Sequence, residues 1–110
     1  MRVVYIAGPY SASCPYEVEQ NIRRAEAIAI EVARLGCAPL CPHTMMRWTP
    51  LDLHAFAYRM TLELMRRCDA VLFAEDWQRS MGARDEHAEA VRLGLPVFFA
   101  LPDLLAWAAS

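Results

Sequence analysis

The sequence predicts an α/β fold in which a parallel sheet carries helices on both faces. Short β-branched and aromatic runs alternate with longer segments whose apolar residues recur at helical spacing. Two predicted helices end in similar sequences and are each followed by a strand: VARLG at residues 32–36 and AVRLG at residues 90–94. This similarity indicates βα repetition. With 110 residues, 56% of them hydrophobic, the chain suits one globular domain. We therefore expect a Rossmann/flavodoxin-like three-layer sandwich with four to five strands over residues 1–110.

In the first half of the chain, a strand at residues 2–7 stops at the turn Gly8-Pro9. Pro15 suits the first turn of the helix that follows, and Gly36 suits its end. A second strand then reaches Pro42, and a loop follows it at residues 44–50. The predicted strands are 2–7, 37–41, 70–74 and 95–100, and the predicted helices are 16–35, 52–67, 80–93 and 103–109.

Two segments of this prediction have two interpretations each. The loop at residues 44–50 carries Met46 and Trp48, which suit either a lid over a planar ligand or packing against the sheet edge. The tail at residues 104–107 is apolar and suits either a subunit interface or closure of the sheet.

The composition excludes several classes of function. A net charge of −2 argues against a protein that binds a nucleic acid polymer by neutralising phosphates. The 11 basic residues are all arginine, so Schiff-base chemistry and a P-loop lysine are excluded. Met1 leads directly into a strand-like run, with no signal peptide or membrane span visible. We expect a cytoplasmic protein.

The cysteines also favour a cytoplasmic protein. Buried free thiols are common where Cys37 and Cys68 lie, at strand entries, which favours a reduced compartment. Cys37, Cys41 and His43 are close enough to suggest zinc, but a second pair of ligands is missing from the spacing. We expect neither a metal nor an organic cofactor.

The stretch Ser80-Met81-Gly82-Ala83-Arg84-Asp85-Glu86 follows a predicted buried strand and opens a helix. A hydroxyl, free backbone N–H groups and carboxylates at a strand-to-helix turn are the layout of a polar-ligand site. The structural interpretation is that Ser80 is an N-cap and that the two acids favour the helix dipole. The local sequence leaves both open.

Right-handed crossovers place the carboxyl ends of parallel strands at one edge, where such folds bind ligands. Asp69 lies at the head of its strand, so we expect it at the opposite edge unless that strand starts later. Its structural alternative is to cap the preceding helix or to hydrogen-bond neighbouring backbone. The residues expected at the ligand edge are Tyr5, Gly8, Tyr10, Ser11, His43, Asp76, Trp77, Ser80, Gly82, Asp85 and Glu86.

Three motifs carry a resemblance to a known family: Ile-Ala-Gly-Pro-Tyr at residues 6–10, Pro42-His43, and Gly-Ala-x-x-Glu-His at residues 82–87. In this order, and with a tyrosine in the first strand, they resemble the nucleoside 2-deoxyribosyltransferase superfamily. Its hydrolytic branch, the 2'-deoxynucleoside 5'-phosphate N-hydrolases, is included. The resemblance runs from residue 4 to residue 97. The Gly-Gly-x-Gly-Thr run of cytokinin-activating phosphoribohydrolases is missing.

The resemblance implies that Glu86 is a nucleophile that attacks the anomeric carbon, and that Tyr5 orients its carboxylate. It implies that Asp69 handles the leaving base, and that Ser80 and the Gly82 N–H contact the sugar 5' end or its phosphate. The implied partner is a small-molecule nucleoside or nucleotide, and the implied assembly is a homodimer or higher homo-oligomer. Beyond the resemblance, their place at the ligand edge makes six further residues candidates for substrate binding: Gly8, Tyr10, Ser11, His43, Asp76 and Trp77. Asp85 or Asp76 is the alternative acid if Asp69 lies too far away, and Trp77 or Trp48 suits either stacking on the base or a structural role.

The loop after the first strand, Pro9-Tyr10-Ser11-Ala12-Ser13, departs from the basic, Gly-rich loop of the hydrolytic branch. A second departure from the family pattern is Arg84, which stands where a second glycine is usual. A side chain there either narrows the pocket or offers a guanidinium to a phosphate. The main alternative to an enzyme is a catalytically silent module that binds a nucleotide or metabolite. A third possibility is an interaction protein whose acids only cap helices.

Overall fold

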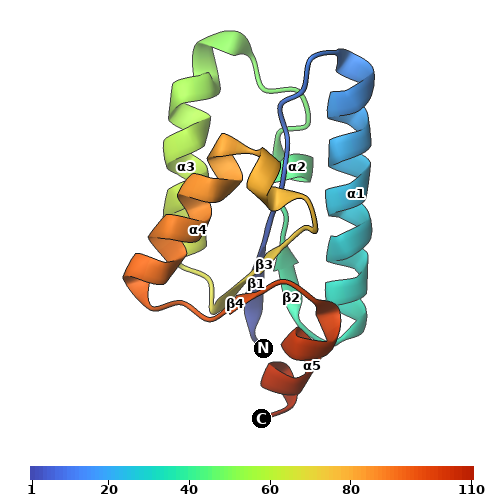
Figure 1. Ribbon diagram of the computed structural model, residues 1–110, viewed down its shortest axis with the longest axis vertical. Coiled ribbons are helices and arrows are strands. Elements are labelled where there is room, and N and C mark those ends of the chain that lie inside the picture. The colour runs from blue at the N-terminus through green and yellow to red at the C-terminus, as the bar shows by residue number, and fades with distance from the viewer.

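The computed structural model describes residues 1–110 and confirms the predicted α/β fold: four parallel strands form one sheet in the order β2-β1-β3-β4 (Figure 1). The strands are β1 (Val3–Ala7), β2 (Ala38–Leu40), β3 (Ala70–Phe73) and β4 (Val97–Phe98). The helices are α1 (Pro15–Arg34), α2 (Pro42–Met45), α3 (His54–Arg66), α4 (Met81–Leu93) and α5 (Leu101–Ala109), with 3₁₀ turns η1 (Leu51–Leu53) and η2 (Trp77–Arg79).

The alternation of side chains along β1 divides the core into two layers. Val4 and Ile6 face α1 and α5, whereas Tyr5 and Ala7 face α3 and α4, and all four are almost fully buried. Figure 1 shows the same arrangement, with α1 and α5 on one side of the sheet and α3 and α4 on the other. The sheet therefore presents Tyr5 to the side on which α4 lies.

The fourth strand is shorter than the sequence predicts, because residues on both sides of it belong to helix ends. Leu95 still donates its N–H to the carbonyl of Ala90 as part of the end of α4. Pro96 has no N–H to offer, although its carbonyl accepts from Val71. On the other side, α5 begins at Leu101, two residues before the predicted start. Helix α2 and turn η2 were not predicted, because each is only one turn long.

The C-terminal tail closes one layer of the core. Leu104 is fully buried among residues of β1 and α1, and Trp107 packs against Phe98 with ring centroids 5.4 Å apart. The guanidinium of Arg2 lies 4.0 Å from the centre of the Trp107 ring, a cation–π contact that joins the two ends of the chain. This arrangement matches the interpretation that the tail closes the sheet. No helix is both long and apolar enough to cross a membrane.

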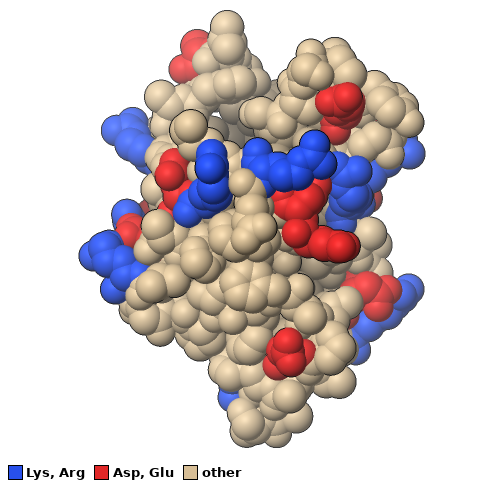
Figure 2. Space-filling view, in the orientation of Figure 1, with Lys and Arg blue, Asp and Glu red and all other residues tan.

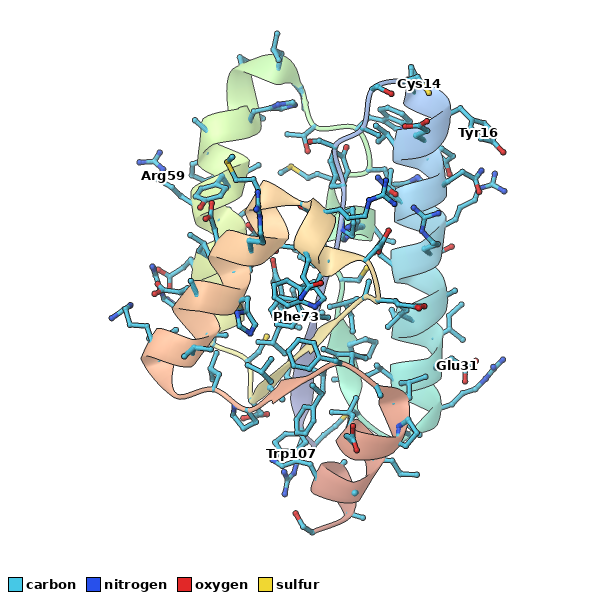
Figure 3. All side chains as sticks on the ribbon, in the orientation of Figure 1. Cys14, Tyr16, Glu31, Arg59, Phe73 and Trp107 are labelled. Atoms are coloured by element: carbon cyan, nitrogen blue, oxygen red, sulfur yellow. The ribbon has the colours of Figure 1, made fainter.

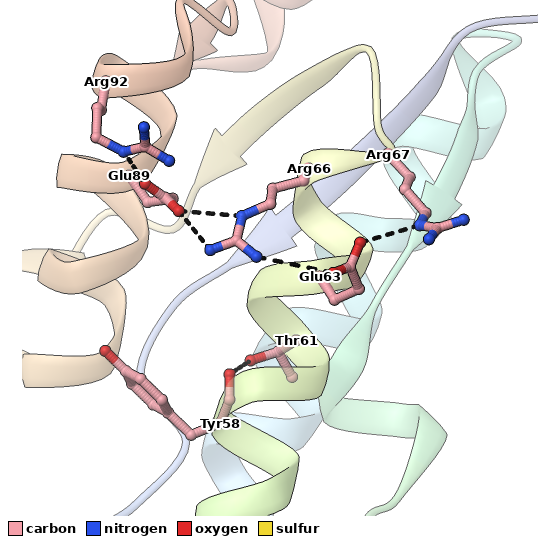
Figure 4. Close-up of polar contacts among 7 residues, drawn as sticks. All are labelled: Tyr58, Thr61, Glu63, Arg66, Arg67, Glu89 and Arg92. Atoms are coloured by element: carbon pink, nitrogen blue, oxygen red, sulfur yellow. Dashed lines mark hydrogen bonds and ion pairs between the residues drawn. The ribbon is translucent and has the colours of Figure 1, made fainter.

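A network of ion pairs joins α3 to α4 (Figure 4). Nε and Nη2 of Arg66 both donate to Oε2 of Glu89, at 3.0 and 2.6 Å, and Arg92 donates to the other oxygen of Glu89. Arg66 also lies 3.7 Å from Glu63, which pairs with Arg67. On the face of the molecule seen in Figure 2, basic and acidic side chains are interspersed. The network fixes how α4 lies along α3.

We predict that Gly8→Ala destabilises the fold. A Cβ on Gly8 would lie 2.9 Å from Cβ of Ala74, and the hydrogen bond from the Ala74 N–H to the Ala7 carbonyl keeps these two segments from separating. The free energy of unfolding, measured by urea denaturation, should fall by about 1–3 kcal/mol.

The matched control is Gly82→Ala. A Cβ on Gly82 meets nothing closer than Oγ of Ser80, at 3.9 Å, and alanine favours a helical position over glycine. The control should therefore unfold no more easily than the wild type. An equal loss of stability in both variants would contradict the steric argument.

Candidate active site

A cleft of about 480 Å³ opens at the carboxyl ends of the strands, between the loop after β1, α2, α3 and the start of α4. Such a volume suits a small organic ligand. Of the residues predicted for this edge, the cleft brings together Tyr5, Gly8, Tyr10, Ser11, His43, Ser80, Gly82 and Glu86.

The inner end of the cleft holds a tyrosine and a carboxylate in direct contact. Tyr5 donates the hydrogen of its hydroxyl to Oε2 of Glu86. Tyr5 is only 1% exposed, because the middle of β1 pairs with strands on both sides. Glu86 lies in the second turn of α4, which packs over that face of the sheet. The fold therefore fixes both partners of this hydrogen bond.

Burial dominates the electrostatics of this pair. It raises the pKa of Glu86 to about 7; the hydrogen bond from Tyr5 opposes this rise, and the negative charge of Asp85 adds to it. Burial, followed by the charge of Glu86 and the hydrogen bond to it, also raises the pKa of Tyr5. Tyr5 thus stays a hydrogen-bond donor, while Glu86 is poised to change charge near neutral pH.

The start of α4 forms one wall of the cleft. Oγ of Ser80 accepts from the Ala83 N–H at 3.2 Å, so the N-cap interpretation of Ser80 holds, and the same residue also lines the cleft. The first turn of a helix leaves backbone N–H groups without helical acceptors, and Gly82 lies in that turn. Arg79 is the one arginine that lines the cleft. This wall suits an electronegative part of a ligand.

Side chains of α2 and the loop beyond it hold the opposite wall in place. His43 is 6% exposed and its Nε2 lies 2.9 Å from the carbonyl of Pro9, which can only accept, so Nε2 carries the proton. Burial lowers the pKa of His43, which favours the neutral ring. Tyr10 donates to the Arg47 carbonyl, and Asn21 donates to the Tyr10 carbonyl at 3.0 Å. The loop after β1 is therefore fastened on both sides.

Asp69 does not reach the cleft, which corrects its assignment to the leaving base. It immediately precedes β3, at the amino ends of the strands, and its Oδ2 accepts from the Val3 N–H at 2.7 Å. Its own N–H donates to the Val3 carbonyl at 2.8 Å. Strand β3 does not start late enough to carry Asp69 to the other edge. Its role is to hold the amino ends of β1 and β3 together.

Trp77 and Asp76 also lie outside the cleft, because turn η2 directs this segment toward β4. Trp77 stacks on His87 with ring centroids 4.6 Å apart, and both pack against Phe73 and Phe99. Phe73 is labelled in Figure 3, where it lies beneath α4. Asp76 caps η2. The path of this segment therefore argues against stacking of Trp77 on a base and against an acid role for Asp76.

Asp85 and Trp48, which the sequence also allows as the acid and as a stacking surface, lie outside the cleft as well. Oδ2 of Asp85 accepts from the Tyr58 hydroxyl at 2.7 Å. Trp48 is 54% exposed and does not line the cleft, although Met46 and Thr49 from the same segment do. Glu86 is consequently the only carboxylate in the lining.

Sequence reasoning missed the contribution of α3. Its inner face lines the cleft with residues spaced by three or four positions, as one side of a helix requires: His54, Ala57, Tyr58 and Thr61. The signal in the sequence was the polar character of this face, since a helix that only packs on a sheet is apolar there. Zinc is not supported by the geometry, because no group of three or more His, Cys, Asp or Glu side chains is placed to hold a metal.

Comparison with known proteins places the chain in a family. Residues 2–100 match a family described as a domain of unknown function (DUF7768). The chain belongs to this family. No curated protein matches it.

Two solved structures share the fold of this DUF7768 chain. A 2-deoxyribosyltransferase from the psychrotolerant bacterium Bacillus psychrosaccharolyticus matches with a TM-score of 0.61 and 19% identity, over 86% of this chain and 69% of that one. A 2-deoxyribosyltransferase from Leishmania mexicana matches with a TM-score of 0.63 and 22% identity, over 88% of this chain and 62% of that one. The chain thus spans less than two thirds of the Leishmania protein. At these identities the likeness concerns the fold.

We predict that Glu86 makes the protein less stable as the pH rises through neutrality. Its pKa in the folded state, about 7, lies above the ordinary 4.5, so the folded state binds the proton more tightly than the unfolded state. This contribution to stability is full below about pH 4.5 and is lost as the pH rises through about 7. Glu86→Gln should remove this dependence and unfold less readily than the wild type at pH 8, by about 1–3 kcal/mol.

The measurement is urea denaturation of both proteins at intervals from pH 4 to pH 8. Other groups also titrate in this range, so the informative quantity is the difference between the two curves. A difference that does not change with pH would show that Glu86 titrates as it does in the unfolded chain.

Proposed function

We propose that this protein cleaves or transfers at the N-glycosidic bond of a nucleoside, a deoxynucleoside or one of their 5'-monophosphates. The observation that carries the proposal is the Tyr5–Glu86 hydrogen bond: the only carboxylate in the cleft is held by a buried phenol. A carboxylate near an anomeric carbon stabilises the positive charge that develops when the glycosidic bond breaks. The surrounding cleft is large enough for a nucleoside.

A single carboxylate favours a retaining mechanism. Enzymes that invert the sugar need a second carboxylate to activate water on the opposite face, and the lining contains none. In the retaining route, one oxygen of Glu86 attacks the anomeric carbon and the bond to the base breaks, which leaves a glycosyl ester on Glu86. Water then hydrolyses this ester, or a second base takes the sugar from it.

The surroundings of Glu86 suit this role. The carboxylate has no cationic partner, so no ion pair has to break before it attacks. Tyr5 binds one of its oxygens, Oε2, and leaves the other available. Because burial raises the pKa of Glu86 to about 7, a substantial ionised fraction is present at neutral pH and is poorly solvated.

The polar wall and the fold support the substrate class. Ser80, the N–H groups of the first turn of α4 and Arg79 offer contacts for the 5' hydroxyl or phosphate of the sugar. Arg84 is exposed and does not line the cleft, so its side chain does not narrow the pocket. The two solved structures compared above are both described as 2-deoxyribosyltransferases. A binding module would differ only in turnover, which an assay decides.

We predict that the purified chain releases or exchanges the base of at least one member of a panel of nucleosides, deoxynucleosides and their 5'-monophosphates. Glu86→Gln should lose this activity by about a thousandfold or more, because it cannot form the ester, whereas Tyr5→Phe should lose about tenfold to a hundredfold, because only the orientation of Glu86 is affected. Chromatography of the free base, with and without an acceptor base, separates hydrolysis from transfer.

The control is Glu31→Gln, a partly exposed carboxylate on α1 that pairs with Arg34 outside the cleft. It should keep the wild-type rate. Tight binding of one panel member without turnover would favour the binding module. Neither turnover nor binding would leave Glu86 without the proposed role.

A further inference from the structure

A leaving base needs a proton, and the cleft offers few sources of one. This inference rests on the proposed function. When the glycosidic bond breaks, its electron pair stays on the base, and a natural base departs far more easily if a proton reaches it in the transition state. Glu86 is engaged as the nucleophile, and no other carboxylate lines the cleft. The donor must therefore be of another chemical kind.

The three tyrosines in the lining are already committed as donors. The hydroxyl of Tyr5 donates to Glu86, that of Tyr10 donates to the Arg47 carbonyl, and that of Tyr58 donates to Asp85. The hydrogen bond to Asp85 also raises the pKa of Tyr58, which makes its proton harder to release. A phenol held in this way is a poor acid at neutral pH.

Most of the remaining polar groups fail for other reasons. His43 keeps its one proton on Nε2 for the Pro9 carbonyl, and burial disfavours a second proton on its ring. Arg79 does not release a proton in a protein. The serine and threonine side chains in the lining are alcohols, which are weak acids, and the hydroxyl of Thr61 donates to the Tyr58 carbonyl at 2.9 Å. One titratable side chain is left.

His54 is placed to supply the proton. It starts α3, lines the cleft and is exposed. Its Nε2 lies 3.0 Å from the Thr49 carbonyl, which can only accept, so Nε2 carries a hydrogen and Nδ1 is the atom that gains and loses a proton. The Thr49 contact also fixes the orientation of the ring.

His54 and Thr61 lie two turns apart on the face of α3 that lines the cleft. Thr61, seven positions after His54, lies beside the reacting pair, where its hydroxyl partly offsets the rise in the pKa of Tyr5. Seven residues of helix rise about 10 Å. Because His54, Thr61 and Glu86 all line the cleft, a base that extends from a sugar at Glu86 along this face of α3 would approach His54.

We propose that His54 is the general acid that protonates the leaving base. As Glu86 attacks the anomeric carbon, the electrons of the C–N bond pass to the base, and a ring nitrogen or exocyclic oxygen of the base takes the proton from Nδ1 of His54. The imidazole is then neutral. When water attacks the glycosyl ester, the imidazole takes a proton from that water, which restores His54, frees Glu86 and completes hydrolysis. In transfer, the acceptor base attacks the glycosyl ester in place of water, and the imidazole of His54 takes its proton from that base.

The test compares two leaving groups in one variant, His54→Gln. The amide nitrogen of glutamine occupies the place of Nε2 and can still donate to the Thr49 carbonyl, but the variant has no group that titrates. With the nucleoside that the wild type uses best, kcat should fall by about a hundredfold or more. With the 4-nitrophenyl glycoside of the same sugar, whose leaving group departs as a stable anion, kcat should stay within about threefold of the wild type.

An equal loss with both substrates would overturn the proposal and show a structural or binding role, and so would unchanged activity with both. Asp52→Asn, in the turn just before α3 and outside the cleft, controls for disturbance of this region and should keep wild-type rates. If His54→Gln does not fold, the wild type itself provides the test across a series of bases. A rate that depends steeply on the basicity of the leaving base would show that no proton is supplied and would contradict the proposal.

The two proposals fail in different ways. Absence of base release or exchange by the wild type contradicts the proposed function. Base release that disappears in Glu86→Gln, combined with equal losses for both leaving groups in His54→Gln, contradicts only the assignment of His54.

Discussion

The structure depends on a hydrogen bond between a buried phenol and a partly buried carboxylate at the inner end of the cleft. Removing a carboxylate from water is unfavourable unless it is well hydrogen-bonded. Here Tyr5 is the compensating donor, and it works only because β1 lies in the middle of the sheet and its inward face opposes α4. A shift of β1 by one residue would turn Tyr5 toward α1 and leave Glu86 without its donor. The register of the sheet and the position of α4 are therefore tied to this one contact.

Contacts with α3 in turn determine the position of α4. At one end, Arg66 of α3 joins the helices through Glu89 of α4 (Figure 4); nearer the cleft, Tyr58 of α3 donates to Asp85 of α4. Surface ion pairs add little to stability individually, but two contacts along one helix pair restrict sliding and rotation. This restriction matters for the nucleophile proposed above, which lies next to Asp85 and one turn before Glu89.

The sequence was sufficient for those features that depend on local patterns. Apolar periodicity predicted every strand and every long helix, and the edge rule for parallel sheets predicted that Tyr5, Ser80 and Glu86 would meet. It was insufficient where a short turn redirects the chain, as η2 does when it carries Trp77 away from the cleft. Asp69 was assigned by resemblance against its position in the sheet, and the position proved decisive. The inner face of α3 was missed because a sequence shows which residues share a face, but not whether that face meets another layer or an open cleft.

Glu86 and Glu89 show how one helix can hold the same kind of side chain in two opposite electrostatic environments. Glu89 binds two arginines, and their hydrogen bonds lower its pKa to about 2. Glu86, three residues earlier, has no arginine and is buried beside Asp85, so its pKa rises to about 7. If Glu86 served only to hold the fold together, a cation or an apolar residue would stabilise the protein more at neutral pH. A carboxylate kept in an environment that destabilises its charge is what a nucleophile requires and what a structural residue avoids.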